Sequence, residues 1–231
     1  MQGNPGQGNR RQGDRGQGPG RVRGRVHRRR GGGAALALCA TLLAAPAGAQ
    51  SGLAPGWTLQ PEASSLRFQS VKNETVVESS GFAAFAGGID AAGMAQVRVM
   101  LDSVDTGIDL RNVRMRFLFF ESFRYPEAVI SARIDPQALA DLPERRRMTL
   151  DLPYTLDLHG VSRALSAEVV VTQISDALVA VSTNAPIAIH AADFNLAEGV
   201  RKLEEAAGVR IIPSATVSLD FVFARDGGAL P

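Results

Sequence analysis

Cysteine is almost absent from this sequence of 231 residues, which contains only Cys39. Cys39 lies inside a short apolar run, and no cysteine follows it. The rest of the chain therefore excludes a disulfide framework, a thiolate nucleophile and a cysteine-based metal site. Lipid attachment at Cys39 is an alternative fate for this residue, but Leu38 precedes it where lipoprotein processing prefers a small residue.

Histidine and catalytic motifs are also scarce. After residue 49 the only histidines are His159 and His190, which lie in separate segments without metal-ligand spacing. A glycine-rich phosphate loop, a dinucleotide fingerprint and a G-x-S-x-G elbow are all missing. The carboxylates between Asp102 and Glu121 lie around a predicted turn, where aspartate commonly forms local hydrogen bonds. The sequence therefore predicts no enzyme, no catalytic residue and no metal site.

A hydrophobic run long enough to cross a bilayer is missing as well. The apolar run Ala34–Ala45 has 12 residues, whereas a transmembrane helix needs roughly 20. A basic segment precedes this run and a small-residue A-x-A pattern follows it, which is typical of a signal peptide. We expect residues 1–49 to be removed between Ala49 and Gln50, leaving residues 50–231 as one exported domain.

The charge of the chain is divided unevenly between these two parts. Residues 1–49 contain 9 Arg and 1 Asp, and the rest contains 16 Lys and Arg against 22 Asp and Glu, a net charge of −6. An acidic domain argues against a nucleic-acid partner. The basic segment is unusually long, so translation could instead start at Val22 or Val26. A nucleic-acid-binding arm is the rival interpretation of this segment.

Most of the remaining sequence alternates between apolar and polar residues, as β-strands do. The longest alternation spans Met148–Leu158, and Val97–Leu101 and Val217–Phe223 repeat it. Within Met148–Leu158, Pro153 predicts a bulge or an unpaired edge. Earlier in the chain, Gly87-Gly88 predicts a turn between strands. Several closely spaced strands without a βαβ rhythm favour an all-β, antiparallel sandwich or barrel.

One segment has a helical period instead. Leu196, Val200, Leu203 and Ala207 recur at three- and four-residue steps. This spacing predicts an amphipathic helix that Asp193 or Asn195 caps and that Gly208 ends. We also expect a short helical turn at Pro136–Leu142.

Three pieces of the sequence resemble the YceI-like family, whose members are periplasmic, lipocalin-like barrels that bind polyisoprenoid lipids. The pieces are SVDTG with RNVRMR, the corner Tyr125–Ala128, and LHGVSR at Leu158–Arg163. The resemblance covers Trp57 to about Arg225. It implies an antiparallel barrel of about eight strands with one or two short helices. We expect Leu101–Ala128 to contain a strand, a polar turn, the strand RNVRMR and an aromatic cluster.

The resemblance also implies an apolar interior that holds a ligand, although the residue pattern alone favours a plain packed core. The expected lining residues alternate with polar neighbours or lie in aromatic runs: Phe68, Met115, Phe117, Tyr154, Leu156, Phe221 and Phe223.

Basic residues are the candidates for a head-group rim. Strand alternation would place Arg114 and Arg116 on one face, and His159 lies in the Leu-His-Gly loop. All three could donate hydrogen bonds to a polar or pyrophosphate head group. The alternative is a solvated face for the arginines, paired to nearby carboxylates, and a turn-stabilising role for the histidine.

The function that the resemblance implies is a periplasmic carrier of a polyisoprenoid or a related amphiphile, such as a quinone or an isoprenoid phosphate. No other cofactor is expected. The rivals are a packed barrel that acts as a scaffold in an envelope assembly, and a lipid-modifying enzyme. The expected partner is an amphiphilic lipid, not nucleic acid, with no transmembrane segment in residues 50–231; a homodimer is left open.

Overall fold

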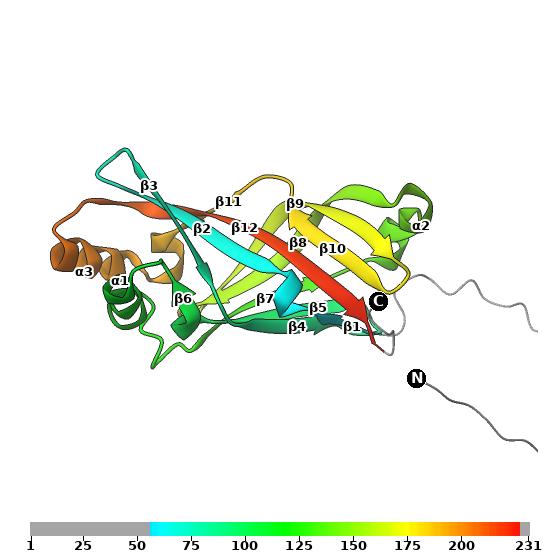
Figure 1. The fold of residues 1–231 in the computed structure, drawn as a ribbon, viewed down its shortest axis with the longest axis horizontal. Coiled ribbons are helices and arrows are strands. Elements are labelled where there is room, and N and C mark those ends of the chain that lie inside the picture. The colour runs from blue at the N-terminus through cyan, green and yellow to red at the C-terminus, as the bar shows by residue number, and fades with distance from the viewer. Residues whose placement is uncertain (1–55, 227–231) are drawn as a thin grey trace, which may run out of the picture. The chain divides into compact units, whose positions relative to one another are not determined.

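A computed structural model describes residues 56–226, and all twelve strands in this range belong to one antiparallel sheet (Figure 1). The expected signal peptide and its cleavage site lie outside the described residues. The strands are β1 (Trp57–Leu59), β2 (Ser65–Lys72), β3 (Val76–Phe82), β4 (Phe85–Ile89), β5 (Met94–Met100), β6 (Val104–Asp105), β7 (Glu127–Arg133), β8 (Arg147–Leu158), β9 (Val161–Ser175), β10 (Leu178–Thr183), β11 (Ile187–His190) and β12 (Ile211–Arg225).

Eight of these strands close into a ring, which confirms the predicted barrel. The hydrogen-bonded order is β1-β4-β5-β7-β8-β9-β10-β12, and β12 pairs again with β1. The long strand β12 has β10 and β11 along one edge and β1 and β2 along the other. Beyond the ring, β2 pairs with β3, and β3 pairs with the two-residue strand β6.

Short helices complete the domain: α1 (Asp109–Arg114), α2 (Leu142–Arg145), α3 (Ala197–Ala207), the π-helix η3 (Met115–Phe119), and the 3-10 helices η1 (Pro61–Ala63), η2 (Leu101–Ser103), η4 (Pro136–Leu139) and η5 (Ala191–Phe194). Figure 1 shows α1 and α3 together at one end of the barrel and α2 at the other. We call these the α1/α3 end and the α2 end.

The alternating patterns of β8 and β12 have the predicted orientation. Leu152, Tyr154, Leu156 and Leu158 of β8 face the barrel interior, as do the alternate residues of β12 from Val217 to Phe223. Pro153 causes no bulge, since it pairs with Ser166 in a continuous β8–β9 register. The pairing of β8 with β7 instead ends at Tyr154, the residue beside the proline. Proline has no backbone N–H to donate, and Pro153 lies where the hydrogen-bonded pairing between β7 and β8 has already ended.

The prediction for Leu101–Ala128 was wrong over most of its length. Only β6 and the first residues of β7 are strands, and RNVRMR forms α1 and the start of η3. The segment Asp109–Phe119 contains no glycine or proline, and its buried Met115 and partly buried Phe119 are four residues apart, a helical spacing. Asn112 Oδ1 accepts hydrogen bonds from the backbone N–H of Thr106 at 2.8 Å and from its hydroxyl at 2.6 Å, which ties the loop to the helix.

Two local predictions also need correction. Gly87-Gly88 lies within β4 rather than in a turn, because a Cβ at Gly87 would be 2.2 Å from Gln96 O and one at Gly88 would be 2.5 Å from Trp57 O. The two glycines therefore allow close strand packing where the ring closes.

Helix α3 lacks the predicted side-chain cap. Its N-cap residue is Leu196, which makes no side-chain capping bond, while Asn195 adopts a φ of 56° that ends η5. Gly208, at a φ of 64°, ends α3 as predicted.

Candidate functional site

A cavity of about 560 Å³ extends through the barrel interior to the α1/α3 end. Most of its wall is apolar and comes from the inward faces of the ring strands, together with Val200 and Leu203 of α3 and Met115 of η3. The volume falls within the roughly 300–1,000 Å³ that is usual for small-molecule sites. The ring thus encloses space rather than a completely filled core.

Six of the seven residues expected to line the interior lie on this wall: Phe68, Met115, Tyr154, Leu156, Phe221 and Phe223. Phe221 and Phe223 pack edge to face at 6.4 Å. Burial raises the pKa of the Tyr154 hydroxyl above its ordinary value, so it remains a neutral polar group on the apolar wall.

The prediction that Phe117 lines the interior was wrong, because the segment expected to be a strand is helical. Its side chain is 59% exposed, is not part of the cavity wall, and stacks on Phe123 with ring centroids 6.4 Å apart.

Charged side chains gather on the cavity wall at the α1/α3 end. Glu78 of β3 accepts from Lys72 of β2 at 2.5 Å and from Arg111 of α1 at 2.8 Å. Arg114 lies one helical turn after Arg111 and also lines the cavity. We call Lys72, Glu78, Arg111 and Arg114 the mouth cluster. With three cations and one carboxylate, this cluster has the charge to bind an anionic group.

Only one member of the mouth cluster, Arg114, is among the residues predicted from the sequence to form the rim. Arg114 lines the cavity, whereas Arg116, expected on the same face, does not. The reason is that the segment is helical, and a helix does not place residues i and i+2 on one face. Arg116 is half-buried, and its Nε has no hydrogen-bond partner in the described residues. The sequence feature that could have identified more of the cluster is the pair Lys72 and Glu78, which lie on either side of the short Asn73–Thr75 turn. In the structure, Asn73 and Glu74 of this turn adopt a positive φ.

His159 does not lie on the cavity wall either. It occupies the β8–β9 turn at a φ of 51°, and its ring packs against Tyr125 at 4.2 Å between centroids. Burial lowers the pKa of His159, and the nearby Glu121 carboxylate partly opposes this shift. The next residue, Gly160, has a φ of 76°, and a Cβ there would be 3.0 Å from the Tyr125 ring. This corner therefore fits the turn-stabilising alternative.

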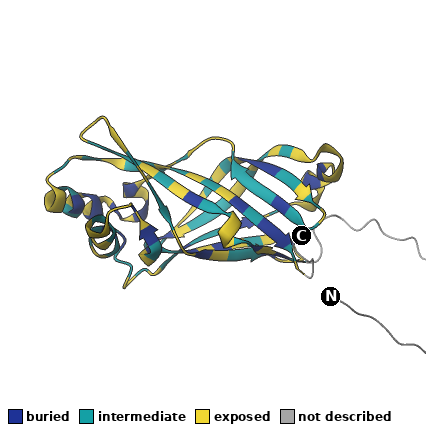
Figure 2. Ribbon diagram, viewed as in Figure 1, coloured by how far each residue is buried: buried dark blue, intermediate teal, exposed yellow. Residues whose placement is uncertain are grey.

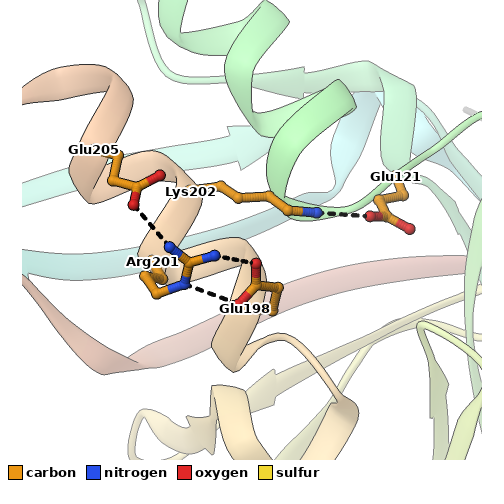
Figure 3. Close-up of polar contacts among 5 residues, drawn as sticks. All are labelled: Glu121, Glu198, Arg201, Lys202 and Glu205. Carbon is orange, nitrogen blue, oxygen red and sulfur yellow. Dashed lines mark hydrogen bonds and ion pairs between the residues drawn. The ribbon is translucent and has the colours of Figure 1, made fainter.

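Contacts between α3 and η3 hold the two helical segments together beside the cavity. Gly199 permits close packing, since a Cβ there would lie 3.0 Å from Phe119 Cα. Lys202 Nζ donates to Glu121 Oε1 at 3.3 Å (Figure 3). On the outer side of α3, Arg201 bridges Glu198 and Glu205, with Nε–Oε2 and Nη1–Oε1 distances of 2.9 and 2.7 Å (Figure 3).

Within residues 56–226, no three His, Cys, Asp or Glu side chains are grouped closely enough to hold a metal ion. No helix in that range is long and apolar enough to cross a membrane.

Comparisons with known proteins agree with this geometry. The sequence model of the YceI-like domain matches residues 57–223. A polyisoprenoid-binding domain from Saccharophagus degradans, implicated in plant cell wall breakdown, is 33% identical, with a TM-score of 0.68 over 73% of this chain and 98% of that domain. BcnA from Burkholderia cenocepacia shares the fold at 18% identity, with a TM-score of 0.55 over 71% of this chain and 98% of its own.

No curated protein matches the chain significantly. The family match covers most of the chain and spans nearly the whole described barrel, from β1 to within three residues of the last one described. The sequence motifs, the closed eight-strand ring and its apolar cavity lead to the same conclusion: this chain belongs to the YceI-like family.

Proposed function

We propose that this protein is a lipid carrier that holds a polyisoprenoid, or an amphiphile of similar shape, inside the barrel. The observation that carries the proposal is the apolar cavity of about 560 Å³, which a packed scaffold barrel would fill with side chains. The S. degradans domain, which is described as polyisoprenoid-binding, supports the choice of ligand class. The role is one of binding, with no catalytic step and no cofactor besides the lipid.

Enclosure of the ligand is needed for tight binding. Burying about 20 lipid carbons at roughly 0.8 kcal/mol each gives about 16 kcal/mol before costs. Lost motion and ordering oppose this by about 4–15 kcal/mol. A shallow groove that covered half of the chain would leave little net affinity, whereas a cavity surrounded by strands retains the larger part.

The mouth cluster is the proposed head-group site. Arg111 and Arg114 come from successive turns of one helix, and both reach the cavity wall. Glu78 is shared between Lys72 and Arg111, so it cannot neutralise every cation at the mouth. An isoprenoid phosphate would therefore gain charge-assisted hydrogen bonds, typically about 1.5–3 kcal/mol each, that the corresponding alcohol would not.

The carrier proposal is tested by the lipid that the protein retains. The full chain, expressed in bacteria and purified without detergent, should show in native mass spectrometry a mass increment of one lipid per protein. Organic extraction should remove the increment and return the polypeptide mass. A protein that carries no lipid, and takes up none when incubated with farnesyl or longer prenyl alcohols, would contradict the proposal and favour the scaffold.

The head-group site has its own test. Arg111→Gln combined with Arg114→Gln should weaken binding of a prenyl phosphate by at least about tenfold and leave the alcohol of equal length unaffected. Arg116→Gln, next in the same helical segment but off the wall, is the matched control. Equal losses for both ligands would mean that the arginines support the fold, and no loss for either would remove them from the site.

We also infer that the protein acts in the periplasm. The basic segment, apolar run and A-x-A pattern of residues 1–49 support export. A cysteine-free domain is also compatible with an oxidising compartment, because it has no thiol to oxidise.

A further inference from the structure

Exposed apolar side chains are concentrated in one stretch beside the cavity mouth. Five of the ten large apolar residues exposed in the described chain lie between Ile108 and Phe123: Ile108, Leu110, Val113, Phe117 and Phe123. Phe123 is 73% exposed, and its ring stacks on that of Phe117. Figure 2 shows exposed positions on α1 at this end of the barrel. Apolar side chains grouped in this way on a surface mark an interaction site.

This stretch is continuous with the cavity. Ile108 and Leu110 are 49% and 58% exposed, and both also belong to the cavity lining. The apolar wall therefore extends through the mouth to the outer surface. On α1 and η3, Leu110, Val113 and Phe117 follow at steps of three and four residues, so they share one helical face.

The charge of the stretch is opposite to that of its domain. Residues 108–123 contain three arginines, Asp109 and Glu121, a net of +1, within a domain of net −6. Glu121 is already paired with Lys202. Within the described residues, Arg114 and Arg116 have no carboxylate within 4.0 Å, so no neighbouring carboxylate neutralises their charge. Aromatic and aliphatic side chains on one face of a helix, with arginines beside them, are the pattern of a segment that lies in a membrane interface.

We propose that residues 108–123 dock the mouth of the barrel onto the surface of an anionic lipid bilayer. The proposal rests on the carrier function, because it supplies the route by which a lipid enters: the tail would pass from the bilayer along Ile108 and Leu110 into the cavity without crossing water. A second copy fits this surface less well. In a two-fold dimer two surfaces with the same net positive charge would meet, which is unfavourable.

Vesicle flotation tests the docking separately from lipid retention. The full chain should float with phosphatidylethanolamine vesicles that contain phosphatidylglycerol and should bind less to vesicles without it. Val113→Ser, Phe117→Ser and Phe123→Ser combined should lower the partition coefficient by at least about tenfold, because three apolar side chains leave the interface. None of the three lines the cavity, so native mass spectrometry should show unchanged lipid retention.

The control removes exposed apolar side chains elsewhere on the barrel. Met94→Ser with Ile174→Ser truncates side chains that are 40% and 53% exposed on β5 and β9, away from the mouth, and should float as the wild type does. The proposal is overturned if the wild type binds neither vesicle, or if the triple variant binds as well as the control. It is also overturned if light scattering shows a dimer that the triple variant alone loses. Loss of flotation in the variant supports docking even if no lipid is retained, in which case the carrier function alone fails.

Discussion

Filling the cavity with one added ring is the most direct perturbation of the proposed site. Ala167 of β9 lines the cavity beside Leu152, its pairing partner on the neighbouring strand β8. The substitution Ala167→Phe would place a six-carbon ring where the lipid tail is proposed to lie. If the ring displaces about six lipid carbons at roughly 0.8 kcal/mol each, binding weakens by about 5 kcal/mol, or more than about a thousandfold.

The control for this variant lies on the same strand. Ala164 points outward, is exposed and pairs with Thr155, so Ala164→Phe adds the same ring to the solvent face. Native mass spectrometry after purification without detergent should find lipid in the wild type and in Ala164→Phe, and little or none in Ala167→Phe. Thermal unfolding should show that Ala167→Phe folds, because the ring enters space that is empty of side chains.

Two results would refute this reasoning. Equal lipid content in the two variants would mean that the lipid does not occupy the space beside Ala167. A loss of stability of about 1–3 kcal/mol or more in Ala167→Phe, without loss in Ala164→Phe, is the cost of overpacking a filled core. That outcome would favour the packed interior that the residue pattern alone suggested.

Three further predictions concern other parts of the chain. N-terminal sequencing of exported protein should start at the residue after Ala49; an intact leader on the periplasmic protein would contradict the cleavage. Because burial lowers the pKa of His159, the unfolded chain takes up its proton more readily, so stability should fall as the pH drops below about 6.5. His159→Asn, which tolerates a positive φ, should flatten this fall in melting temperature between about pH 7 and 5, and an unchanged slope would assign it to other groups. In urea unfolding, Gly160→Ala should destabilise the fold more than Gly208→Ala does. Both glycines have a positive φ, which costs an alanine about 1–2 kcal/mol, but only a Cβ at position 160 would meet a side chain, the Tyr125 ring. Equal losses would mean that the ring moves aside.

The barrel was predictable because its strands have one polar face toward solvent and one apolar face toward the interior. In β8 and β12 the alternation continues through long strands, and every inward position from Val217 to Phe223 reaches the cavity. Period-two patterns of this length have few competing explanations. Ring closure was different, since it depends on the three-residue strand β1 pairing with both β4 and β12, and no local pattern encodes that.

The mouth was predicted poorly because its sequence fits two periods at once. Val113, Met115 and Phe117 alternate with arginines as in a strand, while Arg111, Met115 and Phe119 have helical spacing. Packing decides between the two: buried Met115 contributes to the cavity wall, and Phe119 meets Gly199 of α3. The error then extended to the site, since a helix pairs Arg114 with Arg111 rather than with Arg116.

The position of the mouth follows from where strand pairing ends. At the α2 end of β12, β1 bridges β4 and β12, so hydrogen bonds run around the ring, and Trp57 is buried there with Arg225 above its ring at 5.0 Å. At the α1/α3 end, β6 pairs only with β3, and the sheet path stops. Helices that satisfy their own backbone can cover that gap, and they leave room between their side chains for an opening. The cavity, its charged mouth and the exposed apolar stretch therefore share one cause: strand pairing beyond the closed ring ends at β6, and α1, η3 and α3 cover this end of the barrel without sealing it.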